Sequence, residues 1–497
     1  MTSDVAQALS LLDAWTAHSV MQQRPPSVAL TVVHGDRPIW TRVFGYADAA
    51  ARTAATPQTL YRVGSITKTF TALAILQLHE GGKLRLDDRV RDHVETTAIP
   101  VRDAGLLDVM IRELLTHSSG LQRDLPGTSW TGPSFPAEFP DHFSATYSSG
   151  TEWKYSSVGY ALLGEVIAAV SGEPWARYVE RHILGPLGMA KTEAAPLPDE
   201  PRLAPGYVRP TPGEPYAPAP RVDHGAVSPA ASVASTIEDM GRYLAFHMGG
   251  GGSVLSGKGL REMHRPQWLL DDWQTAWGLG VRVRRVDGRV RVGHPGNTPG
   301  FAALIEFIPE LKLGVAVLTN ADDGNPAGYC DYALQLLAPI AAKATVRAAP
   351  ALADGAERYC GHYRSESGHM TMLVVALEGQ LMLVAPGATN PYAARVILES
   401  TPESHTFIMR SSGAFATSPF GESLTFTTSE NGEVIGYDAA SGARFIRKPT
   451  LYIGVERRNQ PEGPYVRVDR RKSQAPYGGI ERRSGGGRRG QDPQSVH

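Results

Sequence analysis

A serine and a lysine three residues apart, Ser65 and Lys68, are spaced as a nucleophile and its base would be. The run Ile66–Leu78 is apolar on almost every face and ends before Gly81-Gly82, which predicts a helix buried on all sides. Ser65 would lie at its N-terminus, where unpaired N–H groups and the helix dipole stabilise negative charge. Lys68 would follow nearly one turn later, and burial would favour the neutral amine that can accept the serine proton. The alternative is a serine that only caps a helix.

Tyr155 is a second candidate for proton transfer. A tyrosine phenol titrates near ~10 in water, so it becomes a base only where neighbouring cations stabilise the phenolate. Lys68 would be that cation, and the pair could carry the Ser65 proton to a leaving group. Ser157, two residues further on, could hydrogen-bond to Lys68 or to substrate. The alternative is a half-buried aromatic residue that precedes a helix.

The third candidate is His294-Pro295-Gly296-Asn297, which lies inside a strand-like stretch. A glycine such as Gly296 on a strand lets a ligand approach the backbone closely. The N–H of Asn297 could join that of Ser65 as the two donors of an oxyanion hole. His294 would face the substrate as a hydrogen-bond donor or carboxylate partner, unless it is a structural histidine. Because proline cannot donate to a ladder, Pro295 indicates an edge strand or a strand that lines a cleft.

The elements that would position these residues follow from periodicity and turn signals. They include a β-hairpin, four further helices and a group of antiparallel strands near the end of the domain. The hairpin is Ser27–Val33 with Pro38–Phe44; the helices are Val109–Thr116, Val158–Val170, one opened by the capping box Ser235-Thr236-Ile237-Glu238 and running to Met248, and Ala327–Ala342; the strands are Gly278–Val283, Val290–Val292, Phe301–Ile308 and Leu313–Leu318. We therefore expect one α+β domain over residues 1–345.

Two long segments without clear periodicity are expected to shape the site. Gln122–Gly150 is rich in Pro, Gly, Ser and Phe and is too long for a plain connector, while Pro198–Pro229 is proline-rich. Both are predicted to cover the cleft that holds the substrate.

A second domain is expected after a linker at residues 346–356. Short alternating strands separated by turns predict a small antiparallel β-barrel over residues 357–450. The predicted strands are Met370–Leu377, Gln380–Val384, Ala394–Leu398, His405–Met409, Leu424–Thr427, Val434–Tyr437 and Arg444–Arg447. Residues 451–497 form an Arg/Gly-rich tail with too little apolar content to fold alone, so it is expected to be mostly disordered.

The composition argues against several functional classes. The chain has 497 residues, 42% hydrophobic content and a net charge of −1, so nucleic acid is not an expected partner. The two cysteines, Cys330 and Cys360, make neither a disulfide framework nor a zinc site, and no metal or cofactor is expected. With no signal peptide and no apolar run long enough to span a bilayer, a cytoplasmic location is predicted. The oligomeric state stays open.

Taken together, Ser65-Ile66-Thr67-Lys68, Tyr155-Ser156-Ser157 and His294-Pro295-Gly296 resemble the three motifs of the serine β-lactamase/penicillin-binding-protein superfamily. The likeness covers roughly residues 10–345. It extends to Tyr61-Arg62-Val63-Gly64, Leu114-Leu115-Thr116-His117-Ser118-Ser119-Gly120-Leu121, Gly150-Thr151-Glu152-Trp153-Lys154, Gly159-Tyr160-Ala161-Leu162-Leu163-Gly164 and Leu184-Gly185-Pro186-Leu187-Gly188-Met189.

This resemblance implies a β-lactamase/transpeptidase-like fold, with an antiparallel sheet flanked by helices and an all-helical region. It is closest to the class C branch, which includes family VIII-type carboxylesterases and D-aminopeptidase-like hydrolases besides β-lactamases and D,D-carboxypeptidases. Tyr359-Cys360-Gly361-His362-Tyr363 resembles the start of the lipocalin-like β domain that often follows such hydrolases.

Two positions depart from the class C β-lactamase pattern. The second motif usually ends in asparagine, where this chain has Ser157, and the third usually begins with lysine, where it has His294. A permanently charged lysine suits the carboxylate of a β-lactam. A site with a largely neutral histidine depends less on a carboxylate in its substrate. The resemblance therefore implies a serine hydrolase that forms an acyl-enzyme on small esters or on amides and peptides that contain D-amino acids. The alternatives are a β-lactamase or D,D-carboxypeptidase, and a homologue that has lost catalysis and acts as a scaffold.

Overall fold

The computed structural model describes residues 3–94, 104–124, 143–211, 214–345, 355–377, 380–384, 396–411 and 421–448. The chain divides into two compact units, Met1–Arg347 and Ala348–His497. Most of the predicted linker, the whole predicted tail and residues 125–142 of the first long segment lie outside the described residues.

The first unit is built on a nine-stranded sheet in which every neighbouring pair is antiparallel. Its strands, in sheet order, are β3 (Thr53–Ala54), β2 (Arg37–Asp48), β1 (Ser27–His34), β13 (Leu313–Thr319), β12 (Phe301–Ile308), β11 (Arg289–Thr298), β10 (Arg282–Val286), β9 (Thr275–Trp277) and β8 (Trp268–Leu269). The first hairpin therefore pairs with the last predicted strand, because Val28 of β1 lies opposite both Phe44 of β2 and Thr319 of β13.

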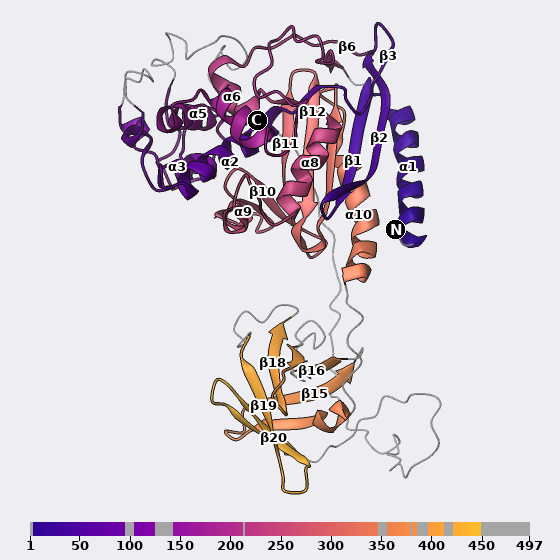
Figure 1. The fold of residues 1–497 in the computed structure, drawn as a ribbon, viewed down its shortest axis with the longest axis vertical. Coiled ribbons are helices and arrows are strands. Elements are labelled where there is room, and N and C mark those ends of the chain that lie inside the picture. Colours follow the sequence, from indigo (N-terminus) through magenta and orange to yellow (C-terminus); the bar gives the residue numbers. More distant parts are fainter. Residues whose placement is uncertain are drawn as a thin grey trace, which may run out of the picture. The chain divides into compact units, whose positions relative to one another are not determined.

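Helices cover both faces of this sheet, and a group of helices lies beside it (Figure 1). α1 (Ser3–Gln23) packs on α10 (Pro326–Thr345), which covers one face, while α8 (Ile237–Met248) covers the other. The helical group comprises α2 (Thr67–Glu80), α3 (Ile111–Leu115), α5 (Ser157–Ser171), α6 (Trp175–Val179) and the short α7 (Ser228–Ala231); α9 (Gly257–His264) contacts α2. Two small sheets join β4 (Tyr61–Arg62) to β7 (Ala234–Ser235) and β5 (Tyr207–Val208) to β6 (Ala217–Pro218).

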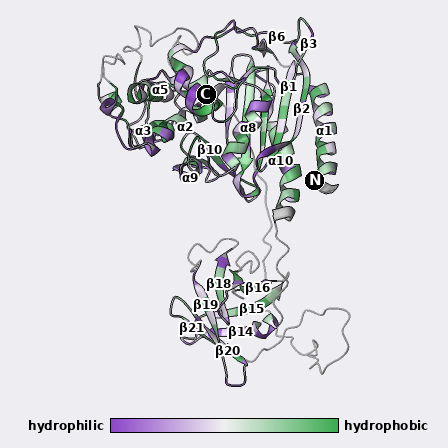
Figure 2. Ribbon diagram, in the orientation of Figure 1, coloured by the Kyte–Doolittle hydropathy of each residue, from purple (hydrophilic) through white to green (hydrophobic). Residues whose placement is uncertain are grey.

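The alternation of side chains along the central strands produces two hydrophobic cores, one on each face. On β1, Val28, Leu30 and Val32 face α1 and α10, whereas Ala29 and Val33 face the core that holds α2, α5 and α8. Because both faces are covered, the central strands are almost wholly apolar, as the green strands of Figure 2 show.

The second unit contains a closed barrel of eight antiparallel strands around a core of its own. Its strands are β14 (Gly361–Ser365), β15 (Thr371–Leu377), β16 (Gln380–Val384), β17 (Val396–Ser400), β18 (Thr406–Ser411), β19 (Ser423–Thr428), β20 (Val434–Ala439) and β21 (Arg444–Lys448). The predicted fold, an α+β domain followed by a small antiparallel barrel, is confirmed. The sequence pattern missed β14, whose pairing with β21 closes the barrel.

Two local predictions were wrong in detail. The α8 helix is capped by Thr236, which accepts a hydrogen bond from the Asp239 N–H, so the cap lies one residue later than the predicted box at Ser235. Gly278–Val283 was predicted as one strand, but the chain turns between β9 and β10, with Gly280 at a φ of 78°. Glycine tolerates this left-handed backbone, which a continuous strand does not contain. Among the described residues, no helix has the length and apolar character needed to cross a membrane.

Candidate active site

Ser65 lies in a short 3-10 turn, Gly64–Ile66, that leads directly into α2. The predicted helix is confirmed, and its residues from Thr67 to Leu78 are buried except for Gln77. Ser65 itself is partly exposed. The turn therefore presents a single accessible hydroxyl at the end of a helix whose other side chains are packed into the core.

Two glycines let this turn press against β11. Gly64 has a φ of 53°, and a Cβ placed on it would lie 2.6 Å from the Asn297 nitrogen. A Cβ on Gly296 would lie 1.9 Å from the Val63 carbonyl oxygen. Because side chains would prevent this contact, the two backbones approach only through glycine. The approach brings the Ser65 turn beside Asn297, as an oxyanion hole shared between them requires.

Lys68 is buried beneath Ser65 and donates three hydrogen bonds. Its Nζ lies 3.2 Å from Ser65 Oγ, 3.5 Å from Ser157 Oγ and 3.0 Å from the Ala230 carbonyl oxygen. Burial lowers the pKa of the ammonium to about 7, although the Asp124 carboxylate partly opposes this shift. A substantial fraction of Lys68 is thus neutral near pH 7 and able to take the Ser65 proton.

Tyr155 also reaches the nucleophile, since its phenol is hydrogen-bonded to Ser65. Lys68 Nζ lies 4.8 Å from the centroid of its ring. Burial raises the pKa of the Tyr155 phenol, the opposite of the shift that a phenolate base needs. The expectation that Lys68 would stabilise a phenolate is therefore wrong, and the electrostatics favour Lys68 as the base and a neutral Tyr155 as a proton carrier.

The second motif is held by the start of α5. Ser156 caps this helix by accepting a hydrogen bond from the Gly159 N–H (2.9 Å), and its hydroxyl donates to the Gln122 carbonyl (2.7 Å). The Ser157 N–H donates to the Arg123 carbonyl (2.8 Å). The described start of the first long segment is thereby joined to the residues that flank Tyr155.

His294 lies within β11 and is fully buried. Its Nδ1 donates to the Pro295 carbonyl (2.5 Å), and its ring centroid is 6.3 Å from that of Tyr155 and 5.3 Å from that of Trp277. Burial and the nearby Lys68 lower the pKa of His294 to about 3. The buried imidazole is therefore neutral near pH 7 and packs beside the rings of Tyr155 and Trp277, whereas Asn297 is exposed.

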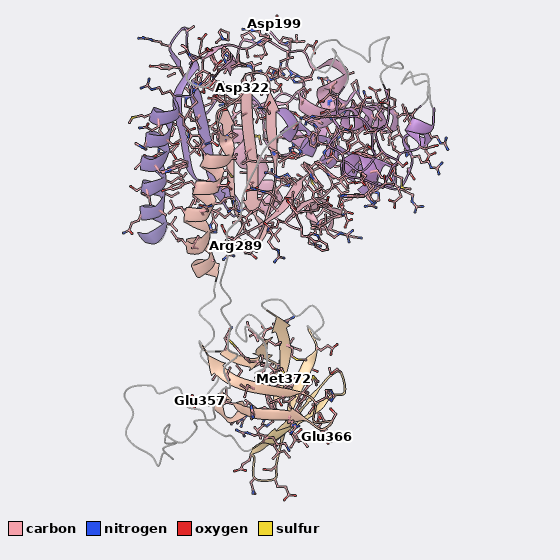
Figure 3. The ribbon with its side chains drawn as sticks, turned by 180° about the vertical axis from the view of Figure 1, so that it is seen from behind. Asp199, Arg289, Asp322, Glu357, Glu366 and Met372 are labelled. Atoms are coloured by element: carbon pink, nitrogen blue, oxygen red, sulfur yellow. The ribbon has the colours of Figure 1, made fainter. Side chains whose placement is uncertain are left out.

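β11 carries Gly296 and Asn297 towards the end of the sheet at which Asp322 lies. Figure 3 shows Arg289, the first residue of β11, at the opposite end from Asp322. The Asn297 side chain donates to the Asp322 carbonyl (3.3 Å), which holds the strand end in place. The structure thus brings together all the residues singled out in the sequence: Ser65, Lys68, Tyr155, Ser157, His294, Gly296 and Asn297.

Sequence reasoning did not assign a role to the aromatic residues that surround Tyr155. The ring of His117 lies 4.2 Å from that of Tyr155, centroid to centroid, and Trp277 lies 5.7 Å from it. Trp153 stacks on Trp277 at 5.5 Å. His117 and Trp153 fall in stretches whose likeness to the superfamily was noted, but Trp277 had no signal beyond an apolar pattern.

The proline-rich segment is tied to the strand that precedes Ser65. Arg62 is buried and donates to carbonyl groups of Val222 (2.9 Å), Ser232 (3.2 Å) and Pro196 (3.5 Å). Beside it lies a cavity of about 250 Å³ whose walls include Tyr207, Pro218 and Phe301. None of the seven predicted site residues lines this cavity, so the described part of the segment contacts the strand before Ser65, and its predicted position over the cleft stays a prediction.

Known proteins resemble this chain in sequence and in fold. A family model described as Beta-lactamase matches residues 12–339. The beta-lactamase-like 1 protein of Homo sapiens is 28% identical over 63% of this chain and 64% of its own length, so the chain spans less than two thirds of that relative. Penicillin-binding protein 4 of Amycolatopsis lactamdurans is 29% identical over 59% of this chain and 81% of that protein. The structure of the octameric penicillin-binding protein homologue from Pyrococcus abyssi covers 88% of this chain and 99% of its own, with a TM-score of 0.58 and 25% identity.

Proposed function

Because the chain belongs to the beta-lactamase family, we propose that it is a serine hydrolase that forms an acyl-enzyme on Ser65. The observation that carries the proposal is the position of Lys68, whose buried amine lies 3.2 Å from Ser65 Oγ and has a pKa of about 7. Serine is a weak nucleophile unless an adjacent base accepts its proton. The distance of this amine from Ser65 and its lowered pKa both suit it to that role.

The proposed reaction has two stages. Ser65 Oγ attacks the substrate carbonyl while its proton passes to Lys68, and the oxyanion accepts hydrogen bonds from the N–H groups of Ser65 and Asn297. Tyr155, hydrogen-bonded to Ser65, then relays a proton to the leaving alcohol or amine. A water molecule attacks the resulting ester, gives up a proton to the same groups and releases the acid and Ser65.

We propose small esters, or amides and peptides that contain D-amino acids, as the substrate class, in keeping with a class C-like branch. His294 supports this choice, because its pKa of about 3 leaves it uncharged where a β-lactamase of this type has a lysine. The substrate position on β11 therefore offers no fixed positive charge to a carboxylate.

β-Lactamase or D,D-carboxypeptidase activity is the second candidate. The similarity to penicillin-binding proteins supports testing it. A scaffold without catalysis is the third, and the Ser65–Lys68 hydrogen bond argues against it, because a scaffold has no need of a buried amine with a lowered pKa.

Covalent labelling tests the reaction class. We expect a fluorophosphonate to label the wild-type protein once and to leave Ser65→Ala unlabelled, because the partly exposed Ser65 hydroxyl lies 3.2 Å from the Lys68 amine. Intact-mass measurement gives the stoichiometry, and circular dichroism confirms that the variant is folded. Equal labelling of Ser65→Ala, or no labelling of folded wild-type protein, would favour the scaffold.

Three chromogenic substrates separate the enzymatic candidates. We expect p-nitrophenyl butyrate or a D-alanyl p-nitroanilide to be hydrolysed with a higher kcat/KM than nitrocefin. The reason is the uncharged His294, which does not hold the nitrocefin carboxylate. A kcat/KM for nitrocefin well above both other values would establish the β-lactamase alternative instead.

A further inference from the structure

We infer that His117 is a positioning residue, whose imidazole holds the Ser156 backbone and the Tyr155 ring so that the phenol meets Ser65. The inference rests on the proposed function, because it assigns the aromatic residue that places the proton carrier of that reaction. Three observations carry it: the backbone of His117, the hydrogen bond of its ring and the charges around it.

The backbone around His117 is strained and firmly anchored. His117 follows α3 with a φ of 61°, in the left-handed region that residues other than glycine seldom adopt. Its carbonyl accepts a hydrogen bond from the Lys154 N–H (2.7 Å), and the Ser118 carbonyl accepts one from the Gly150 N–H (2.8 Å). The turn is therefore bound to the segment that leads into Tyr155.

The imidazole makes two contacts with the second motif. Its Nδ1 accepts a hydrogen bond from the Ser156 N–H (3.1 Å), and its ring packs on that of Tyr155 with centroids 4.2 Å apart. Accepting at Nδ1 fixes the neutral tautomer with the proton on Nε2. Trp277 packs edge-on against the imidazole, with ring centroids 4.9 Å apart, so the imidazole lies between aromatic partners. Without the acceptor, the buried Ser156 N–H would lose its partner and the residue beside Tyr155 would shift.

The charges around His117 keep the acceptor available. The groups that act on it are Lys68, His294 and Arg123, and each lowers the pKa of its imidazole, after burial as the main cause. The tyrosines Tyr155 and Tyr160 that face it stay neutral because burial raises their pKa values. Burial and these neighbours thus oppose a second proton on His117, and Nδ1 remains unprotonated near neutral pH.

His117 is linked to the nucleophile through Ser156 and Tyr155, so we expect its loss to affect the reaction as well as the stability of the fold. Its hydrogen bond ends on Ser156, the next residue to Tyr155, and Tyr155 in turn is hydrogen-bonded to Ser65. A shift of the phenol by about 1 Å is enough to slow a positioned proton transfer by ~100-fold. The effect should appear in kcat, with KM little changed, because only the transition state uses the aligned phenol.

His117→Asn and His117→Leu form a matched pair that tests this role in the full-length protein. The two side chains have nearly the same shape, but only asparagine offers an oxygen where Nδ1 accepts from Ser156. Both variants lose the ring. Asparagine also tolerates the left-handed backbone of residue 117 better than leucine does, so kcat is compared together with the thermal stability of each variant. The substrate is the D-alanyl p-nitroanilide, because its leaving amine must take a proton. We expect kcat of His117→Leu to fall by about 100-fold, and that of His117→Asn to stay at least about tenfold higher, each with KM within about twofold of wild type.

Titration with a fluorophosphonate gives the fraction of active protein in each preparation, and thermal unfolding shows whether the variants are folded. After this correction, equal kcat values for the two variants, or a loss confined to KM or to the active fraction, would overturn the positioning role. Failure of the proposed function has a different signature, because wild-type labelling would then be absent or independent of Ser65. If either variant does not fold, kcat of Tyr155→Phe is compared with that of the wild type. This substitution removes only the phenol hydroxyl that His117 positions. A wild-type kcat in Tyr155→Phe would overturn the inference.

Discussion

Lys68 and Tyr155 are neighbours whose environments move their pKa values apart. Burial disfavours the charged form of each, so it lowers the pKa of the amine to about 7 and raises that of the phenol. The same desolvation thus makes one group a proton acceptor and keeps the other protonated. Residues with such opposed shifts are suited to acid and base roles in one reaction.

This pairing predicts the pH dependence of hydrolysis. Lys68 acts as a base only when neutral, so protonation on the acid side of its pKa of about 7 removes activity. We expect kcat/KM for p-nitrophenyl butyrate to rise with pH, to be half-maximal near pH 7 and to level off above it. Stopped assays between pH 5 and 9 in buffers of constant ionic strength provide the measurement.

His294→Gln is the control for that assignment. The pKa of His294 is about 3, so its imidazole does not titrate in the assay range, and its removal should leave the half-maximal pH near 7 whatever happens to the rate. If the midpoint near pH 7 disappears in His294→Gln, the loss of activity at low pH results from protonation of the histidine and not of Lys68.

The active-site turn and β11 depend on each other through backbone contact. The turn Gly64–Ile66 leads into α2, and β11 carries Gly296 and Asn297, yet the two elements come from opposite ends of the domain. Their close approach requires glycine on both sides. The geometry of the proposed oxyanion hole is therefore a property of the two elements together and of neither alone.

Gly64→Ala and Gly82→Ala separate the effect of this contact from backbone strain. Both glycines have a positive φ, 53° and 67°, but a Cβ on Gly64 would lie 2.6–2.8 Å from Asn297 backbone atoms, whereas one on Gly82 meets nothing within 4 Å. We expect Gly82→Ala to cost about 1 kcal/mol of unfolding free energy through strain alone. Gly64→Ala should cost roughly 2 kcal/mol more and abolish ester hydrolysis.

Urea denaturation gives the two free energies, and p-nitrophenyl butyrate turnover gives the activity of each variant. Equal destabilisation by the two substitutions, with hydrolysis retained in Gly64→Ala, would contradict a tight contact between the turn and β11.

The whole chain consists of two units with separate cores. The cores of the first unit contain residues from Ala8 to Ala341, and the barrel core contains residues from Ala356 to Phe445. Because each unit has its own hydrophobic core among the described residues, we propose that each unfolds as a cooperative body of its own.

Scanning calorimetry of the full chain should therefore show two transitions. A chain that ends after Arg347 should keep the first unit's transition to within about 2 °C, roughly 1 kcal/mol or less for a unit of this size. It should also keep its hydrolytic activity, since all seven proposed site residues lie before this point. A single transition in the full chain, or loss of the first unit's transition on truncation, would show that the two units are one thermodynamic domain.

Local sequence signals were enough to predict several features of this protein. The helix after Ser65, the hairpin of β1 and β2, and strands β12, β13 and β16 follow from apolar periodicity and glycine turns, which act within a few residues. The three spaced motifs also led to the family, because few chains carry them in that order. Where the signal was a single turn residue, as at Gly280 or Thr236, the predicted boundary was displaced.

Only the tertiary structure decided the chemistry of the site. Burial lowers the pKa of Lys68 to about 7, keeps the Tyr155 phenol protonated and keeps His294 neutral. This burial depends on segments that lie far apart in the sequence. The contact of His117 with Ser156 and the closure of the barrel by β14 and β21 are likewise long-range. Hydrophobic periodicity tells which face of an element is buried, but desolvation and hydrogen bonding depend on which partners it meets there.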